Sequence, residues 1–221
     1  GVDIGGTFTD IVLMGSDGSV QTKKVSSTPD DYGRGIVQGL QDLLGEVGAQ
    51  PTDVESVVHA TTVATNAILE EKGAKTGLIT TQGFRDVLEL RRIGIPVLYD
   101  LEYNHPKVLV PRRLRCEVIE RIGGMGEVRV ALDENSVIKA ATRLRDEGVE
   151  AVAICLINSY ANPAHERRVV ELVREVMPPE VFISGSFEIL PEIREYERTS
   201  TVVVNALLGP VVNEYLSKLA Q

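Results

Sequence analysis

The chain opens with Gly1-Val2-Asp3-Ile4-Gly5-Gly6-Thr7-Phe8-Thr9-Asp10, in which a short apolar strand carrying one acidic residue runs into two glycines and a hydroxyl. Successive glycines allow a turn to direct several backbone N–H groups into one concavity, which suits a phosphate group. Asp3 is next to this turn, where a carboxylate can hold a divalent cation directly or through water. Thr7 and Thr9 add hydroxyl donors. The alternative is a tight hairpin in which Asp3 only caps the turn.

The turn differs from two common phosphate-binding motifs. It lacks the G-x-G-x-x-G sequence of dinucleotide-binding folds and the lysine of the P-loop. It resembles the first phosphate motif of the actin, sugar kinase and heat-shock ATPase superfamily. In that superfamily an Asp-x-Gly-Gly/Ser-Thr hairpin between the first two strands contacts the β- and γ-phosphates. The resemblance implies a ribonuclease-H-like mixed sheet with flanking helices.

The rest of the chain alternates buried strands with amphipathic helices, which predicts an α/β fold. Three antiparallel strands are expected first, at Val2–Ile4, Thr9–Met14 and Val20–Ser26. Later strands are expected at Ser56–Ala60, Thr76–Thr80, Ala151–Ile157 and Val181–Ser184. Helices are expected between Pro29 and Gly48, from Thr65 to Lys72, over Gly83–Leu90, between Asp133 and Gly148, between Asn162 and Pro178, and from Arg194 onward with an interruption at Gly209-Pro210.

The periodic pattern is lost over residues 91–111, where three prolines occur. A hairpin formed by Leu114–Ile122 and Glu127–Val130 is expected to follow, around the glycines of residues 123–126. We therefore predict a first part of the phosphate-binding domain at 1–90, a small insertion at 91–131, and the remaining α/β part at 132–221. Because the sequence starts without methionine and ends inside a helical pattern, it is expected to be a piece of a longer protein.

Composition excludes several classes of function. The 221 residues carry a net charge of −9 and 5% aromatic residues, which argues against a nucleic-acid surface. No apolar run has the length of a membrane span, about 18 residues. Cys116 and Cys155 are far apart and flanked by apolar residues, so both are expected to be buried free thiols. A reducing compartment fits this pattern, and we predict a cytoplasmic protein that binds neither nucleic acid nor membrane.

A second group of polar residues follows the strand expected at Ser56–Ala60. His59 can donate, accept or transfer a proton near neutral pH. Thr61, Thr62 and Asn66 offer neutral hydrogen-bonding groups at the carboxyl end of a strand, where ligands bind in open α/β sheets. The alternative is that Thr62 or Thr65 caps a helix and that His59 is a satisfied strand residue.

Other charged groups have simpler interpretations. Arg85, Asp86, Arg91 and Arg92 could meet an anionic substrate, but a solvated helix face is the interpretation we favour. Glu195, Glu197 and Arg198 are expected to form surface ion pairs that contribute little to stability.

Several segments together resemble the hydantoinase/oxoprolinase family, in the amino-terminal region of its ATP-dependent subunit. They are the opening segment, His59–Ala67, Gly83–Glu89, Ser159–Glu166 and Glu195–Thr201. The resemblance implies an ATP- and Mg²⁺-dependent enzyme that opens a hydantoin or 5-oxoproline ring after phosphorylating the carbonyl oxygen. It implies that Asp3 organises Mg²⁺ and that the nucleotide is bound by Asp3, Gly5, Gly6, Thr7 and Thr9. It places His59, Thr61, Thr62 and Asn66 near the reacting end as catalytic candidates.

The resemblance also implies parts beyond this sequence. A second ATPase domain is expected after residue 221, and a hydantoinase B-like subunit or a fused equivalent is the expected partner. The fragment alone is therefore expected to be inactive. Three alternatives remain open. They are the ATP-using subunit of an acetone or acetophenone carboxylase, a non-catalytic, actin- or chaperone-like nucleotide switch, and a structural domain whose glycine-rich hairpin binds no ligand.

Overall fold

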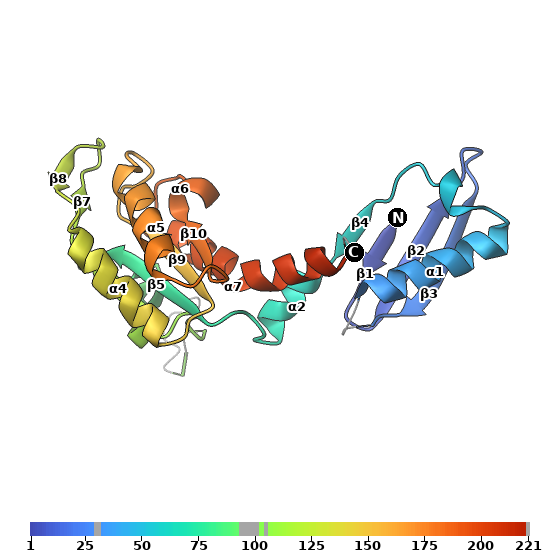
Figure 1. Cartoon of the computed structure of the whole chain (residues 1–221), viewed down its shortest axis with the longest axis horizontal. Coiled ribbons are helices and arrows are strands. Elements are labelled where there is room, and N and C mark those ends of the chain that lie inside the picture. The colour runs from blue at the N-terminus through green and yellow to red at the C-terminus, as the bar shows by residue number, and fades with distance from the viewer. Residues whose placement is uncertain (29–31, 93–101, 104–105, 220–221) are drawn as a thin grey trace. The chain divides into compact units, whose positions relative to one another are not determined.

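The first 26 residues form three consecutive antiparallel strands, as their alternation predicts. In the computed structural model, which describes residues 1–28, 32–92, 102, 103 and 106–219, they are β1 (Val2–Ile4), β2 (Phe8–Met14) and β3 (Val20–Ser26) (Figure 1). β4 (His59–Thr61) pairs with β1 in parallel, so the sheet order is β3-β2-β1-β4. β4 starts three residues later than the strand predicted at Ser56–Ala60.

One face of this sheet is covered by α1 (Tyr32–Val47), which packs against β2 and β3 (Figure 1). The buried side chains of this small core include Val2, Ile4, Ile11 and Leu43. The helix approaches closely at Gly39, where a Cβ atom would collide with the side chain of Ile11. The short helix η1 (Pro51–Asp53) precedes β4, and α2 (Val63–Leu69) follows it.

The later strands form a second sheet and do not extend the first one. β5 (Thr76–Thr81), β6 (Arg115–Val118), β9 (Ala151–Cys155) and β10 (Phe182–Gly185) pair in parallel in the order β10-β9-β5-β6. The first sheet is mixed, as expected, because β1 pairs antiparallel with β2 and in parallel with β4, but the later strands form a separate parallel sheet. Every residue of β5 and β9 is buried. A fully buried strand needs side chains packed on both of its faces and a hydrogen-bonded strand on each side. β4, the edge strand of the first sheet, is short and largely exposed, so it cannot provide such an environment for β5 or β9.

Helices flank the second sheet. α4 (Glu134–Asp146) and α5 (Ala164–Val176) lie side by side, and the shorter helices are α3 (Val87–Leu90), α6 (Ser186–Ile189) and η2 (Arg112–Leu114). The predicted cap of α4 is confirmed, because the Asp133 carboxylate accepts a hydrogen bond from the Asn135 N–H at 3.0 Å. Both cysteines are free and buried, as predicted.

The predicted hairpin around residues 123–126 is present but shorter. β7 (Arg121–Ile122) pairs with β8 (Val128–Val130), whereas β6 belongs to the second sheet, so Leu114–Ile122 is not one strand. The chain leaves the sheet at Ile119, whose N–H donates to Ser136 Oγ at 3.0 Å and whose carbonyl accepts from the Asp133 N–H.

The last helix, α7 (Glu195–Leu219), continues through Pro210, so the expected interruption is absent. Proline removes one hydrogen bond, and Gly209 just before it packs directly on the Phe182 ring, where a Cβ atom would collide. No helix in the described part of the chain is long and apolar enough to cross a membrane.

The chain divides into two compact units, Gly1–Gly73 with Val211–Gln221, and Ala74–Pro210. The boundaries expected near residues 90 and 131 both fall inside the second unit. The helix start expected at 29–31 and much of the irregular stretch at 91–111 lie outside the described residues.

Candidate functional site

The turn between β1 and β2 is braced by its neighbours. The Gly5 N–H donates to the Phe8 carbonyl at 3.0 Å, and Ser27 donates its hydroxyl to the Gly5 carbonyl at 2.8 Å and its N–H to the Thr7 carbonyl at 2.9 Å. Gly6 and Thr7 are exposed, and within the described residues nothing accepts a hydrogen bond from their N–H groups. These two donors are therefore available to a ligand.

Thr9 supports the turn indirectly, through Ser27. Its side chain is buried, and its hydroxyl is 3.0 Å from the Ser27 hydroxyl. Because Ser27 donates to the Gly5 carbonyl, Thr9 acts as the donor in this pair. The Thr9 hydroxyl, which the sequence analysis predicted to bind a nucleotide, is therefore hydrogen-bonded within the protein.

Two carboxylates share the uncovered face of the first sheet. Asp3 is paired directly with Asp10 in the β1–β2 register, and both residues are exposed. Directly paired residues project from the same face of a sheet. Lys24 contacts the Asp10 carboxylate at 3.0 Å, whereas Asp3 has no ion pair among the described residues. Asp10 lies in the opening segment, but the sequence alone predicts no role for it, because only the strand register brings it beside Asp3.

Residues at the start of α2 join the carboxyl end of β1. Thr62 donates from both its N–H and its hydroxyl to the Ile4 carbonyl, each at 3.4 Å. Asn66 Nδ2 donates to Thr62 Oγ1 at 3.3 Å, and the Thr61 hydroxyl accepts from the Val63 N–H at 3.2 Å. Asn66 also adjoins the turn, since a Cβ atom on Gly6 would be 3.3 Å from Asn66 Nδ2. Thr62 and Asn66 thus lie beside the glycine turn.

His59 lies elsewhere. It is paired in register with Val2, so its side chain projects from the face opposite Asp3. Its Nε2 atom is hydrogen-bonded to the buried Tyr215 hydroxyl, and the two rings stack with centroids 5.6 Å apart. His59 Nδ1 is buried and has no hydrogen-bond partner within the described ranges. The structure therefore brings together Asp3, the turn, Thr62 and Asn66, but not His59.

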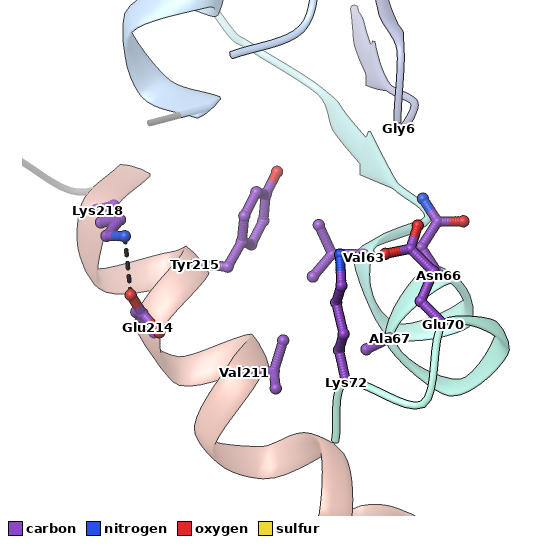
Figure 2. Close-up of a pocket in the computed structure, with 10 residues that line it drawn as sticks. All are labelled: Gly6, Val63, Asn66, Ala67, Glu70, Lys72, Val211, Glu214, Tyr215 and Lys218. Atoms are coloured by element: carbon purple, nitrogen blue, oxygen red, sulfur yellow. Dashed lines mark ion pairs between the residues drawn. The ribbon is translucent and has the colours of Figure 1, made fainter. Parts of the chain in front are cut away.

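A pocket of about 340 Å³ opens beside the turn (Figure 2). All of its lining residues belong to the first unit. They come from the glycine turn, from α2, from Glu70 and Lys72 just after α2, and from the last turns of α7. The full set is Gly6, Val63, Asn66, Ala67, Glu70, Lys72, Val211, Glu214, Tyr215 and Lys218. Sequence reasoning did not find this pocket, because residues 6, 66 and 215 are brought together only by the fold.

The second unit has a buried polar cluster near the carboxyl end of β9, where two of the segments used for the family resemblance meet. Glu166 accepts hydrogen bonds from the N–H groups of Leu156 at 2.6 Å and Phe187 at 2.9 Å, and from the Ser186 hydroxyl. Burial raises the pKa of the Glu166 carboxyl above its ordinary range, although these hydrogen bonds oppose the shift. The cluster holds the loop after β9.

Arg198 belongs to the same cluster, which corrects its assignment to a surface ion pair. It is 1% exposed and donates to the carbonyls of Leu156 at 2.6 Å and Glu192 at 3.1 Å. Its position four residues before Val202, on the apolar side of α7, is the sequence signal that could have revealed this burial.

The charged residues near α3 pair within the chain. Asp86 binds Arg112 through two contacts of 3.0 Å and also contacts the buried Arg115 at 3.3 Å. The hydrogen bonds from Arg112 hold the pKa of Asp86 below its ordinary range. Arg92 pairs with Glu197, and Arg85 Nε is buried without a hydrogen-bond partner in the part of the chain that is described.

These features define the class of protein. It is a mixed α/β protein with helix-flanked sheets and a glycine-rich turn, next to an acidic residue, directly after its first strand. The chain belongs to the hydantoinase/oxoprolinase family, because the model of the family's N-terminal region matches residues 1–177. The resemblance inferred from the sequence motifs is confirmed.

Individual relatives agree with this membership. The chain is 40% identical to caprolactamase subunit alpha of Pseudomonas jessenii over 99% of its own length and 32% of the relative's. It is 33% identical to 5-oxoprolinase 1 of Arabidopsis thaliana over 98% of its length and 19% of the relative's. The chain thus spans about a third or less of the length of these curated relatives.

Two solved structures have the same fold. One is the ATP-dependent caprolactamase from Pseudomonas jessenii, with a TM-score of 0.89, 40% identity, and coverage of 99% of this chain and 32% of that one. The other is a nucleotide-free acetone carboxylase from work on ATP-dependent acetone carboxylation. It has a TM-score of 0.89 and 28% identity, and the match covers 100% of this chain and 33% of that one.

Proposed function

We propose that this chain is the phosphate-binding, amino-terminal portion of an ATP-dependent enzyme that opens a cyclic amide of the hydantoin or 5-oxoproline type. The observation that carries the proposal is the exposed Gly6–Thr7 turn, which begins three residues after Asp3 and whose N–H donors are unused within the described residues. The names of two relatives, a caprolactamase and a 5-oxoprolinase, support a cyclic amide as the substrate.

In this proposal the turn binds the terminal phosphates of ATP. Gly6 and Thr7 provide the free N–H donors, Gly5 allows close backbone approach, and Thr9 contributes indirectly through Ser27. Phosphoryl transfer depends mainly on positioning and charge stabilisation, so a braced turn with free donors is what the reaction requires.

The donor set at Asp3 fits Mg²⁺. Magnesium is usually held by one or two carboxylates together with substrate phosphates and water, and Asp3 and Asp10 share one exposed face. Among the residues that the structure describes, no group of three or more metal-binding side chains is present, so phosphate and water would complete the shell. When bound, the ion would neutralise charge on the transferring phosphate.

The carbonyl substrate would lie on the α2 side of the turn. An amide carbon is a poor electrophile because of resonance with nitrogen. Transfer of the γ-phosphoryl group to the carbonyl oxygen releases ADP and makes the carbon electrophilic. Water then adds to that carbon, and the C–N bond breaks as the ring nitrogen takes up a proton. A second water molecule releases inorganic phosphate from the resulting acyl phosphate. Thr62 and Asn66 are the side chains we assign to orient that carbonyl. Thr61 supports the start of α2 through its hydrogen bond with the Val63 N–H. His59 would have a structural role, because its hydrogen bond to Tyr215 holds β4 against α7.

The complete enzyme would contain more than this chain. Because the chain spans about a third of the caprolactamase subunit, we propose a second domain of the ATPase and a partner subunit that complete the site. We further propose that the first sheet belongs to the ribonuclease-H-like superfamily, since its β3-β2-β1-β4 order puts the phosphate turn between the first two strands.

The test is ATP turnover by the complete protein with its partner subunit, in the presence of hydantoin, 5-oxoproline, a simple lactam, or acetone with bicarbonate. We expect a cyclic amide to stimulate ATP hydrolysis and to yield the ring-opened product by mass spectrometry. Carboxylation of acetone would instead support the second candidate, which the match to acetone carboxylase favours. ATP turnover that no substrate stimulates would support a nucleotide switch.

A further inference from the structure

We propose that the pocket between α2 and the end of α7 binds the ring of the acceptor substrate and favours an uncharged cyclic amide over one that carries a carboxylate. This inference rests on the proposed function and adds a substrate preference to it.

The pocket adjoins the site of phosphoryl transfer. Gly6 lines it, and the same residue presents its N–H on the exposed turn. Figure 2 shows Gly6 at one end of the pocket, with Asn66 on the neighbouring helix. A ring in the pocket would therefore have its amide group close to a phosphate held by the turn.

The walls suit a small ring. Val63 and Ala67 on α2 lie opposite Val211 and the Tyr215 ring on α7 (Figure 2). The volume of about 340 Å³ is at the lower end of the roughly 300–1,000 Å³ found for small-molecule sites. Such sites combine apolar walls with a few polar groups that orient the ligand.

The polar group nearest Gly6 is Asn66. A cyclic amide offers one N–H donor and one carbonyl acceptor, and a primary amide side chain matches both with its own acceptor and donors. Within the described chain, Asn66 makes one side-chain hydrogen bond, from Nδ2 to Thr62 Oγ1 at 3.3 Å. That contact fixes the amide beside the turn and leaves its oxygen for a ligand N–H.

The charges around the pocket cancel. Glu70 pairs with Lys72 at 2.6 Å, and Glu214 pairs with Lys218 at 2.8 Å. Each lysine that lines the pocket thus has a carboxylate partner from its own segment. A carboxylate on the substrate would meet two anions as well as two cations, so it gains no net attraction to offset the loss of its hydration.

The experiment changes the pocket charge by one unit in each direction. The complete enzyme is assayed for kcat/KM with ε-caprolactam as the neutral substrate and 5-oxoproline as the charged one. Glu214→Gln removes one negative charge from the pocket lining, Lys218→Gln removes one positive charge, and the double variant restores neutrality. Both side chains are substantially exposed on a helix, so all three variants should fold. Glu46→Gln is the control, because it breaks the ion pair between Glu46 on α1 and Lys23 on β3, both outside the pocket.

We expect the ratio of 5-oxoproline to caprolactam kcat/KM to rise roughly threefold in Glu214→Gln and to fall by a similar factor in Lys218→Gln. The double variant and Glu46→Gln should each give the same ratio of the two kcat/KM values as the unmodified enzyme. Equal ratios in all variants would overturn the pocket assignment while leaving the proposed function intact, as would a preference for 5-oxoproline in the unmodified enzyme. Failure to open caprolactam, 5-oxoproline and hydantoin alike would overturn the proposed function itself.

Discussion

Asp3 and Asp10 are directly paired across β1 and β2, so the two carboxylates stand next to each other on one exposed face of the first sheet. Only Asp10 has a cationic partner among the described residues, namely Lys24 at 3.0 Å. Two neighbouring anions repel each other, and Lys24 offsets this for Asp10 but not for Asp3. A bound cation at Asp3 would relieve the remaining repulsion.

Replacing Asp3 by Asn should abolish ATP turnover while leaving the fold intact. The exposed side chain contributes nothing to the core, whereas loss of its charge would remove the proposed cation ligand. We expect a fall in kcat of roughly 100-fold or more, a size typical for loss of one electrostatic contact to the transition state. Turnover and thermal unfolding should be measured on the complete enzyme.

The control for this change is Asp10→Asn, which should reduce turnover less because Asp10 is already paired with Lys24. Near-normal turnover in a folded Asp3→Asn enzyme would remove Asp3 from the metal site.

Replacing Gly6 by Val should weaken nucleotide binding. Even a Cβ atom at this position would be 3.3 Å from Asn66 Nδ2, and a branched side chain would fill the space between the turn and the pocket. Isothermal titration calorimetry with ATP is the direct measurement, and we expect affinity to drop by roughly tenfold or more. Gly124→Val is a matched control, because a Cβ atom on Gly124 meets nothing within 4 Å. Equal ATP affinity in both variants would make the turn purely structural.

Replacing Tyr215 by Phe should destabilise the first unit. The change removes the hydroxyl bonded to His59 Nε2, and His59 Nδ1 already lacks a partner within the described residues, so the imidazole would lose its hydrogen bond. We expect the free energy of unfolding in urea to fall by about 1 kcal/mol. A double-mutant cycle with His59→Leu should give a coupling energy of about 0.5 kcal/mol or more. Additive effects would show that the two side chains do not stabilise each other.

The ion pair of Asp86 should make stability depend on pH. Its pKa is lowered, chiefly by hydrogen bonds from Arg112, so the unfolded chain binds a proton at a higher pH than the folded chain. The stabilisation is therefore fully present above the ordinary carboxyl pKa of about 3.9 and is lost as the pH falls through the lower folded value.

We expect Asp86→Asn to be less stable than the unmodified chain near neutral pH, with the difference shrinking below about pH 4. Chemical unfolding followed at several pH values measures this difference. Arg112→Gln should remove most of the same pH dependence, and a constant difference at all pH values would exclude the mechanism.

Replacing Arg198 by Met should destabilise the second unit. The buried guanidinium donates to the carbonyls of Leu156 and Glu192, which would lose these partners inside the protein. We expect a loss of about 2–3 kcal/mol in unfolding free energy. Arg198→Lys should not restore stability, because one ammonium group cannot reproduce the planar fork of donors. The exposed Arg129→Met serves as the control, and equal stability of the two variants would contradict the buried role.

The amino-acid sequence determined most of the local structure. The bounds of β1 and β3 agree with prediction, as does the cap of α4, because alternation and capping act over a few neighbouring residues. It also determined the family, because the segments that carry the resemblance are short and contiguous. The glycine turn was recognisable for the same reason.

The tertiary structure alone decided which residues share a site. Strand register placed Asp10 beside Asp3 and turned His59 to the other face, and a one-residue difference in register would reverse that outcome. The division into two sheets and the burial of Arg198 also depend on contacts between residues far apart in the chain. The pocket needs Gly6 and Tyr215 together, residues that are more than 200 positions apart. Local propensity carries no information about such pairings, because they are set by which apolar surfaces are buried together.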